Sequence, residues 1–248
     1  MPTTPEAPVS PEMTAVLAMA ATVPPGLAKV PADRCAEVLG LTGVTVSALT
    51  RSRSLELIWH SQADMLGAAL EDLQYTLGEG PTVECARRNR AVLVPDLTRT
   101  PDTRWPVFVP DALHAGAQAC FAFSLRIGAI QQGVFAGYRT RPGSLTPQQY
   151  RDALAFTETV TFLLLGTVPG TDGRRDPLTD LATLHRAEVH QATGMLAVRL
   201  AISLDEALLE IRTEAFSSGR PILEVAREII DRREDPDPEA PAPSSEPE

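Results

Sequence analysis

The sequence predicts an α+β protein in which an antiparallel-sheet domain, residues 12–167, precedes a three-helix all-α module, residues 178–233. Runs of alternating apolar and polar residues in the first two thirds of the chain are typical of strands. Residues 184–230 instead show helical apolar spacing with start and stop signals. The length of 248 residues and the 44% hydrophobic content allow two modest domains with real cores.

The N-terminal elements follow from these patterns in order. Residues 1–11 are rich in Pro and Thr and predict a disordered tail. Helices are expected over residues 13–21 and 32–39, and alternation at 44–48 and 55–59 predicts a hairpin. A helix over 63–73 leads into the Gly-Glu-Gly-Pro turn at 78–81, where a second helix begins and runs to the arginines at 87–90.

The second half of this domain is expected to complete the sheet. A short strand is predicted at 92–94, a helix from Arg104 to Ala115, and strands at 119–125 and 133–138. Thr146, Pro147 and Gln149 predict the start of a long helix that ends near Leu165, because threonine caps, proline suits the first position and glutamine completes a capping box. Residues 168–177 then form a linker rich in Gly, Pro and Asp.

The C-terminal module has the clearest signals. Ser203 and Glu206 form a predicted capping box for its second helix, Gly219 ends that helix, and Pro221 opens the third. Three short helices bury little surface, at a size where a domain is marginal alone. The module therefore needs a partner surface, either from the rest of the chain or from a second copy.

Charge and targeting signals narrow the function. The net charge of −10 argues against a general polyanion binder. Residues 231–248 contribute seven acids and two arginines to this charge, and the last part of that segment, 234–248, predicts an acidic disordered tail. Residues 174–230 hold seven arginines and nine acids, so a nucleic-acid site there must be a focused patch. The sequence has no apolar run long enough for a membrane helix and no secretory signal, which predicts a cytoplasmic protein.

Catalytic and metal chemistry find no support in the sequence. No catalytic triad, phosphate-binding loop or paired carboxylates are recognisable, and His185 and His190 have the wrong spacing for a helical metal pair. We expect no enzyme activity and no metal site, and the sequence identifies no cofactor. Cys35, Cys85 and Cys120 are expected to be buried thiols, with a redox-sensing Cys85 beside Arg87 and Arg88 as the alternative.

Two family resemblances are carried by short motifs. The N-terminal domain resembles a GAF sensor domain in LEDLQYTLGEGP (70–81), VLVPDL (92–97), RWPVF (104–108) and FAFSLRIGAIQQGVFAGYR (121–139). The C-terminal module resembles an ANTAR domain in Gln191-Ala192-Thr193-Gly194, Asp205-Glu206-Ala207, Ile211-Arg212 and Ala226. Members of that family commonly carry lysine where this chain has Thr193.

These resemblances imply a signal-responsive RNA-binding antiterminator. ANTAR proteins recognise paired stem-loops in nascent transcripts, usually as dimers formed through the first helix, and prevent a terminator hairpin from forming. The resemblance suggests a set of RNA-binding candidates: Arg186, Thr193, Arg212, Ser217 and Arg220. A small molecule in the GAF domain would be lined by aromatic candidates, which either enclose a ligand or pack solidly: Trp59, Phe121, Phe123, Phe135 and Tyr138.

Two other functions stay open. The first is a ligand- or redox-sensing dimeric regulator whose helical module only dimerises, since Thr193 and the acidic module weaken an RNA site. The second is a DNA-binding helix-turn-helix protein, which the scarcity of base-reading side chains on helices two and three argues against. The sequence does not identify the sensed ligand, the target transcripts or whether the signal raises or lowers RNA binding.

Overall fold

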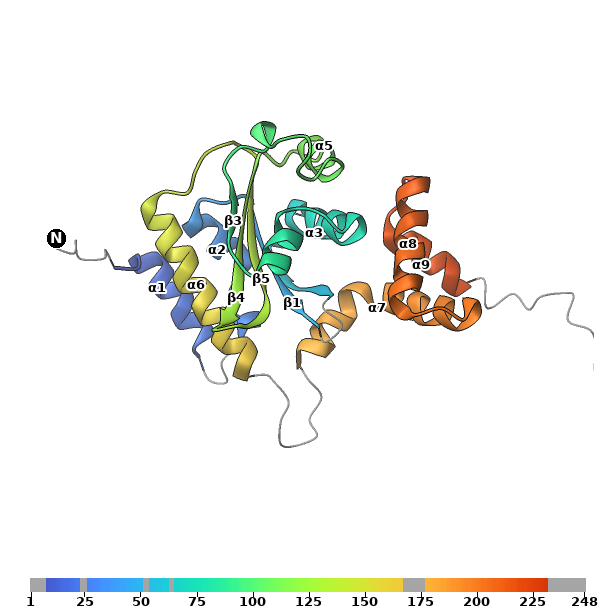
Figure 1. The fold of residues 1–248 in the computed structure, drawn as a ribbon. Helices are drawn as coiled ribbons and strands as arrows, with labels where there is room; N and C mark the ends of the chain where they lie inside the picture. Colours follow the sequence, from blue (N-terminus) through green and yellow to red (C-terminus); the bar gives the residue numbers. More distant parts are fainter. Residues whose placement is uncertain (1–7, 23–25, 51–53, 63–64, 167–176, 232–248) are drawn as a thin grey trace, which may run out of the picture. The chain divides into compact units, whose positions relative to one another are not determined.

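The computed structural model describes residues 8–22, 26–50, 54–62, 65–166 and 177–231, with the backbone alone for 166 and 177–185. The chain divides into two compact units, residues 1–185 and 186–248, which are described separately (Figure 1). Ser10, within the predicted N-terminal tail, caps the first helix by accepting a hydrogen bond from the Met13 amide. The predicted acidic tail, and the predicted linker apart from Pro177, lie outside the described residues.

The N-terminal unit is built on a five-stranded antiparallel sheet with strand order β2-β1-β5-β4-β3 (Figure 1). The predicted strands are all present, and the α+β class is confirmed. The strands are β1 (Gly43–Leu49), β2 (Leu55–His60), β3 (Val92–Val94), β4 (Ala119–Ile127) and β5 (Ile130–Arg139). β4 and β5 are longer than predicted, because the pairing continues to Ile127 and Ile130 and the chain reverses at Gly128, which has a φ of 58°.

Helices cover both faces of the sheet. One face packs against α1 (Pro11–Ala20), α2 (Ala32–Leu39) and α6 (Pro147–Gly166), and the other packs against α3 (Leu66–Leu77), α4 (Pro81–Arg88) and α5 (Phe108–His114). Short 3-10 turns occur at η1 (Leu27–Lys29) and η2 (Leu97–Arg99). Because successive residues of a strand point to opposite faces, both sets of strand side chains are buried.

The two faces form two separate cores. The face under α6 contains aromatic residues from both central strands and the helix, including Phe121, Phe135 and Phe156. The face under α3 and α4 is lined by smaller strand residues with Phe108 and Tyr138. Gly133 is required where β5 approaches β1, since a Cβ atom there would lie 2.2 Å from the Ser47 carbonyl oxygen.

Two helix boundaries lie four residues from their predicted positions. α3 continues to Leu77, where Gly78 ends it with a φ of 66°. The predicted helix start at Arg104 is wrong, because Trp105 has a φ of 58° and the helix begins at Phe108. This start is set from outside the segment, since the Glu79 carboxylate accepts hydrogen bonds from the Val107 and Phe108 amides, both at 2.8 Å.

The C-terminal unit consists of the end of α7 (Pro177–Leu200), α8 (Leu204–Ser218) and α9 (Ile222–Asp231). α7 is kinked at Arg186, whose φ of −132° and ψ of 26° are not helical. The predicted capping box is confirmed, because the Glu206 amide donates to the Ser203 hydroxyl and the Ser203 amide donates to the Glu206 carboxylate. Gly219 ends α8 in the left-handed region, as predicted.

The three helices bury one apolar face each against one another. The buried residues of this module are Val189, Ala192, Leu196, Ala197, Ala207, Ile211, Ala215, Ile222, Val225 and Ala226. They match the helical spacing predicted from the sequence. Larger apolar side chains remain exposed on the same unit, among them Val198, Leu209 and Phe216.

Candidate functional site

The structure buries two of the five RNA-binding candidates. Arg186, at the kink of α7, is only 1% exposed and has interaction partners. Thr193 is 7% exposed, and its hydroxyl donates to the Val189 carbonyl oxygen one helical turn earlier, at 2.7 Å. In this conformation neither side chain is available to a ligand from solvent.

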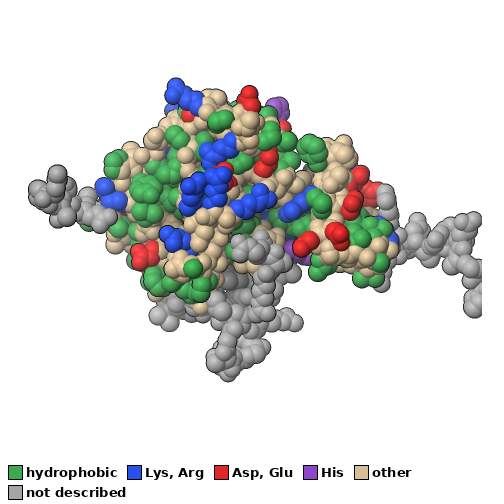
Figure 2. All heavy atoms as spheres, viewed as in Figure 1, with side chains coloured by type: hydrophobic (Ala, Val, Ile, Leu, Met, Phe, Trp, Pro, Cys, Tyr) green, Lys and Arg blue, Asp and Glu red, His purple; other side chains and the backbone are tan. Residues whose placement is uncertain are grey.

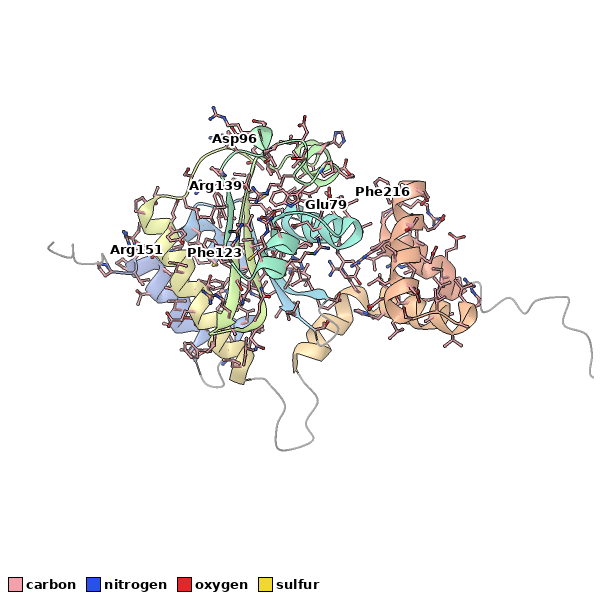
Figure 3. All side chains as sticks on the ribbon, in the orientation of Figure 1. Glu79, Asp96, Phe123, Arg139, Arg151 and Phe216 are labelled. Carbon is pink, nitrogen blue, oxygen red and sulfur yellow. The ribbon has the colours of Figure 1, made fainter. Side chains whose placement is uncertain are left out.

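The remaining candidates lie on α8 and in the α8–α9 turn. Arg212 is half-buried, and Ser217 is exposed with its hydroxyl donating to the Glu214 carbonyl oxygen at 3.2 Å. Phe216, labelled in Figure 3, is 57% exposed. It lies four residues after Arg212, so the two residues share one side of the helix. α8 therefore presents an aromatic ring, a cation and a hydroxyl near its C-terminal end.

Arg220 precedes α9 and is held by that helix. Its guanidinium lies 2.7 Å from the Glu228 carboxylate and 3.7 Å from Glu224, and the hydrogen bond to Glu228 raises the pKa of Arg220. Arg227 forms a similar exposed pair with Glu188 at 3.0 Å. A phosphate that binds Arg220 must therefore compete with two carboxylates.

The described helical unit as a whole is acidic. Residues 186–231 contain five arginines and eight acids, a net charge of −3. Arg199, exposed near the end of α7, is the one arginine of this described segment that is neither buried nor paired. The module thus offers few cations for a long phosphate backbone.

An apolar groove of about 640 Å³ lies within this unit, between α7 and α9. It is lined by His190, Gln191, Gly194, Met195, Val198, Arg199 and Ile229. Val198 is 84% exposed, and a Cβ atom added at Gly194 would meet no atom within 4 Å. Nothing packed against Gly194 within the described chain accounts for a glycine in the middle of this helix.

In the N-terminal unit, the five predicted pocket residues separate onto the two faces of the sheet. Trp59, Phe121, Phe123 and Phe135 belong to the core under α6, whereas Tyr138 belongs to the core under α3 and α4. Phe123 lies on the face that α6 covers (Figure 3). The five side chains do not line a common site.

Three of the four aromatics on the α6 face, Trp59, Phe123 and Phe135, are in ring contact with their neighbours. Ring centroids are 5.5 Å apart for Trp59 and Phe156, 4.8 Å for Phe135 and Phe156, and 6.0 Å for Phe123 and Phe135. The Trp59 indole also donates to the Val30 carbonyl oxygen at 3.0 Å. These distances are those of aromatic pairs in a packed core.

Tyr138 instead belongs to a buried polar network that the sequence did not reveal. The Glu71 carboxylate accepts hydrogen bonds from Tyr138, from Thr45 at 3.1 Å, from Ser47 at 3.2 Å and from Thr82 at 2.9 Å. Burial and the neighbouring Glu71 raise the pKa of Tyr138 well above its ordinary value. Its phenol therefore stays protonated and serves as a donor.

Gln74 extends this network to the Gly-Glu-Gly-Pro turn. Its amide donates to Thr82 and Tyr138, and its carbonyl oxygen accepts from the Thr82 backbone amide at 2.7 Å. Gly80, with a φ of 124°, passes so close that a Cβ atom would lie 2.5 Å from the Gln74 side chain. The only sequence signal was the i, i+3 spacing of two polar residues, 71 and 74, within an otherwise apolar helix face.

The motifs at 78–81 and 104–108 lock together. Glu79, labelled in Figure 3, accepts the hydrogen bonds from the start of α5, and Arg104 makes two hydrogen bonds to Glu84, at 3.1 and 3.0 Å. The Arg104 guanidinium also lies 4.2 Å from the centre of the Trp105 ring. Both motifs thus fix the segment before α5 onto α4.

The three cysteines are free and buried. Burial, with smaller effects from Glu71 and Glu84, raises the pKa of Cys85 from 9.0 to about 12, and burial also raises the pKa values of Cys35 and Cys120. A redox-sensing thiol needs a depressed pKa, so the alternative of a reactive Cys85 is not supported in this conformation. Arg87 and Arg88 do not offset the burial.

No cluster of three or more His, Cys, Asp or Glu side chains in the described part of the chain has an arrangement that suits a metal ion. No helix within the described ranges has the length and apolar character needed to cross a bilayer.

Comparisons with known proteins give matches to solved structures and to one family model. No curated protein matches the chain. The GAF domains of phosphoenolpyruvate-protein phosphotransferases from Acinetobacter and from Coxiella burnetii superpose with TM-scores of 0.48 and 0.47, at 8% and 11% identity, covering 65% and 64% of this chain and 96% of each of theirs. Free methionine-R-sulfoxide reductase from Neisseria meningitidis superposes with a TM-score of 0.44 at 13% identity, covering 61% of this chain and 84% of its own. Residues 180–230, which contain α8 and most of α7 and α9, match the family model of the ANTAR domain.

Proposed function

We propose that the protein is a signal-responsive, RNA-binding transcription antiterminator that acts as a homodimer in the cytoplasm. Residues 178–233 would bind tandem stem-loops in nascent leader RNA, and residues 12–167 would act as a GAF sensor. The observation that carries the proposal is the ANTAR match over residues 180–230, which lies over three helices with their caps and apolar core intact.

On this proposal the RNA-contacting surface is the C-terminal end of α8 with the turn that follows. Arg212, Ser217 and Arg220 remain its candidates, and Phe216 adds an exposed aromatic ring beside them. Unpaired loop bases are commonly stacked on aromatic side chains, and arginines bind the phosphates around them. Arg220 would exchange its contact with Glu228 for a phosphate, whereas buried Arg186 and Thr193 would contribute only if α7 rearranges.

The groove between α7 and α9 supports the homodimer. Its apolar lining and exposed Val198 suit a second helix, and Gly194 in its floor would let that helix approach closely. Two modules in one dimer would bind two stem-loops together, so that the second binding event gains from a high effective concentration.

The signal would enter through the N-terminal unit and act through α6, the last helix before the helical module in the chain. Since the aromatic face is packed and the opposite face holds the Glu71 network, we propose that a small molecule would have to rearrange one of these cores, or that a protein partner provides the signal. We propose no enzyme activity. The free cysteines fit a reducing compartment.

The proposal is tested by binding of the purified full-length chain to a two-hairpin leader RNA, beside a one-hairpin RNA and duplex DNA. We expect binding that needs both hairpins and weakens in Arg212→Ala and in Arg220→Ala. Glu210→Gln, which alters an exposed acid on another side of α8, is the matched control and should keep full affinity. Equal binding to duplex DNA, or none to either RNA, would contradict the proposal.

A second candidate is a dimeric sensor whose helical module only dimerises. The net charge of −3 over residues 186–231 and the pairing of Arg220 and Arg227 with carboxylates favour it. In that case the chain would dimerise through α7 but bind neither RNA at low salt.

A further inference from the structure

We propose that the N-terminal unit itself binds RNA phosphates, through an arginine patch formed by Arg87, Arg88, Arg90 and Arg126. The inference rests on the proposed RNA-binding function and assigns a second contact surface on the same RNA. It makes the sensor domain a direct part of RNA recognition as well as its regulator.

The patch joins the end of α4 to the β4–β5 hairpin. Asn89, which ends α4 with a φ of 47°, accepts a hydrogen bond from Ser124 of β4 at 2.6 Å. Gln131 of β5 donates to the same hydroxyl at 3.0 Å, and Gln131 is the cross-strand neighbour of Arg126. These contacts hold the arginines of the α4 end and the arginine of the hairpin on one part of the surface.

The arginines of this patch are exposed, and little negative charge in the described structure opposes them. The acid beside them in sequence is Glu84, which is 11% exposed at its side chain and is already held by Arg104 through two hydrogen bonds. Arg88 shares that carboxylate at 2.9 Å and remains 55% exposed. Arg87, Arg90 and Arg126 form no ion pair within the described residues, and Figure 2 shows Lys and Arg side chains gathered on one face of the N-terminal unit.

The distribution of charge points to RNA as the occupant. The helical module carries a net charge of −3 over residues 186–231, and its arginines are largely buried or paired. The affinity of a nucleic-acid binder depends strongly on neutralised phosphates, so such a module needs cations from elsewhere. The patch supplies four guanidinium groups flanked by amide and hydroxyl groups, which are typical phosphate-contacting side chains.

The test is the salt dependence of binding to the two-hairpin leader RNA by the full-length chain. The patch variant is Arg87→Gln/Arg88→Gln/Arg90→Gln. The matched control is Lys29→Gln/Arg34→Gln/Arg141→Gln, which removes the same charge from exposed positions on η1, α2 and the loop after β5. A third variant, Arg87→Lys/Arg88→Lys/Arg90→Lys, keeps the charge, and circular dichroism checks that all three are folded.

Each lost phosphate contact reduces the steepness of log affinity against log salt by about one. We therefore expect this slope to be about two to three less steep in the patch variant, and its affinity at low salt to be at least roughly tenfold lower. The control and the lysine variant should keep the slope of the unaltered protein.

Three results would overturn the patch. In the first, the slope of the patch variant is equal to that of the control. In the second, the RNA affinity of the patch variant rises, which would mean that the patch holds an acidic segment of the chain. In the third, the unaltered protein binds no hairpin RNA. The last result alone also removes the proposed function. The first two leave that function standing, so the two failures are distinguishable.

Discussion

Gly194 gives the sharpest single test of how the helical module assembles. Within the described chain, an alanine Cβ at this position would have no atom within 4 Å, so Gly194→Ala creates no clash. Replacing glycine by alanine inside a helix stabilises it by about 1 kcal/mol. In dilute, monomeric protein the module should therefore become more stable. A glycine inside a helix often permits close packing of another helix, which would occur here only in the dimer.

Dimerisation should respond in the opposite direction. If a second α7 packs in the groove, the added methyl groups overpack the interface by about 1–3 kcal/mol, which weakens the dimer by roughly 5-fold to 150-fold. Gly219→Ala is the matched control, because its Cβ also meets no atom but its φ of 64° strains alanine. It should destabilise the module by about 1–2 kcal/mol and leave the dimer contact unchanged.

The two effects are separable in one chain. Both tryptophans, Trp59 and Trp105, belong to the N-terminal unit, so urea unfolding followed by far-UV circular dichroism reports the helical module where the tryptophan fluorescence does not change. Sedimentation equilibrium gives the dimer constant. A destabilised Gly194→Ala monomer would refute the open surroundings of this position, and an unchanged dimer constant would refute the groove as the dimer surface.

Three further predictions concern stability and reactivity. Ser203→Ala removes the α8 capping box and should cost the module about 1 kcal/mol in urea unfolding, whereas Ser218→Ala, outside the box, should cost less. Glu79→Ala leaves the Val107 and Phe108 amides at the start of α5 without their charged acceptor. It should destabilise the N-terminal unit by about 2–4 kcal/mol in tryptophan-monitored unfolding. An effect below about 1 kcal/mol would show that water replaces the carboxylate. Burial raises the pKa of Cys85 from 9.0 to about 12, so its thiol should resist a thiol reagent at neutral pH until the protein unfolds. Because the raised pKa belongs to the folded state, the contribution of the protonated Cys85 thiol to stability is full below pH 9.0 and falls as the pH rises toward about 12. Rapid labelling of the native thiol at neutral pH would contradict the predicted resistance.

Local signals in the sequence were enough for the elements that depend on local chemistry. The capping box at Ser203, the end of α8 at Gly219 and the alternation along β1 and β2 each involve neighbours a few residues apart, and all three are present. The start of α5 was not predictable in this way, since it is set by Glu79, more than 25 residues earlier in the chain.

The candidate sites were harder to predict, because they depend on which side of an element a residue occupies. Alternation along β4 and β5 indicated that half of the aromatics face one core, but not that Tyr138 would join a carboxylate on α3. Helical spacing likewise did not reveal that Arg220 would be held by Glu228. Pairing between acids and arginines across a turn depends on side-chain geometry that composition does not encode.

We propose that this chain prevents transcription termination by binding RNA hairpins. The most direct measurement is in vitro transcription through a two-hairpin leader that ends in a terminator, with the full-length protein added in increasing amounts. We expect read-through to rise with protein concentration, and to fall back when either hairpin is deleted or when Arg212→Ala replaces the unaltered chain. Read-through that stays at its protein-free level at every concentration, with or without hairpins, would contradict the account.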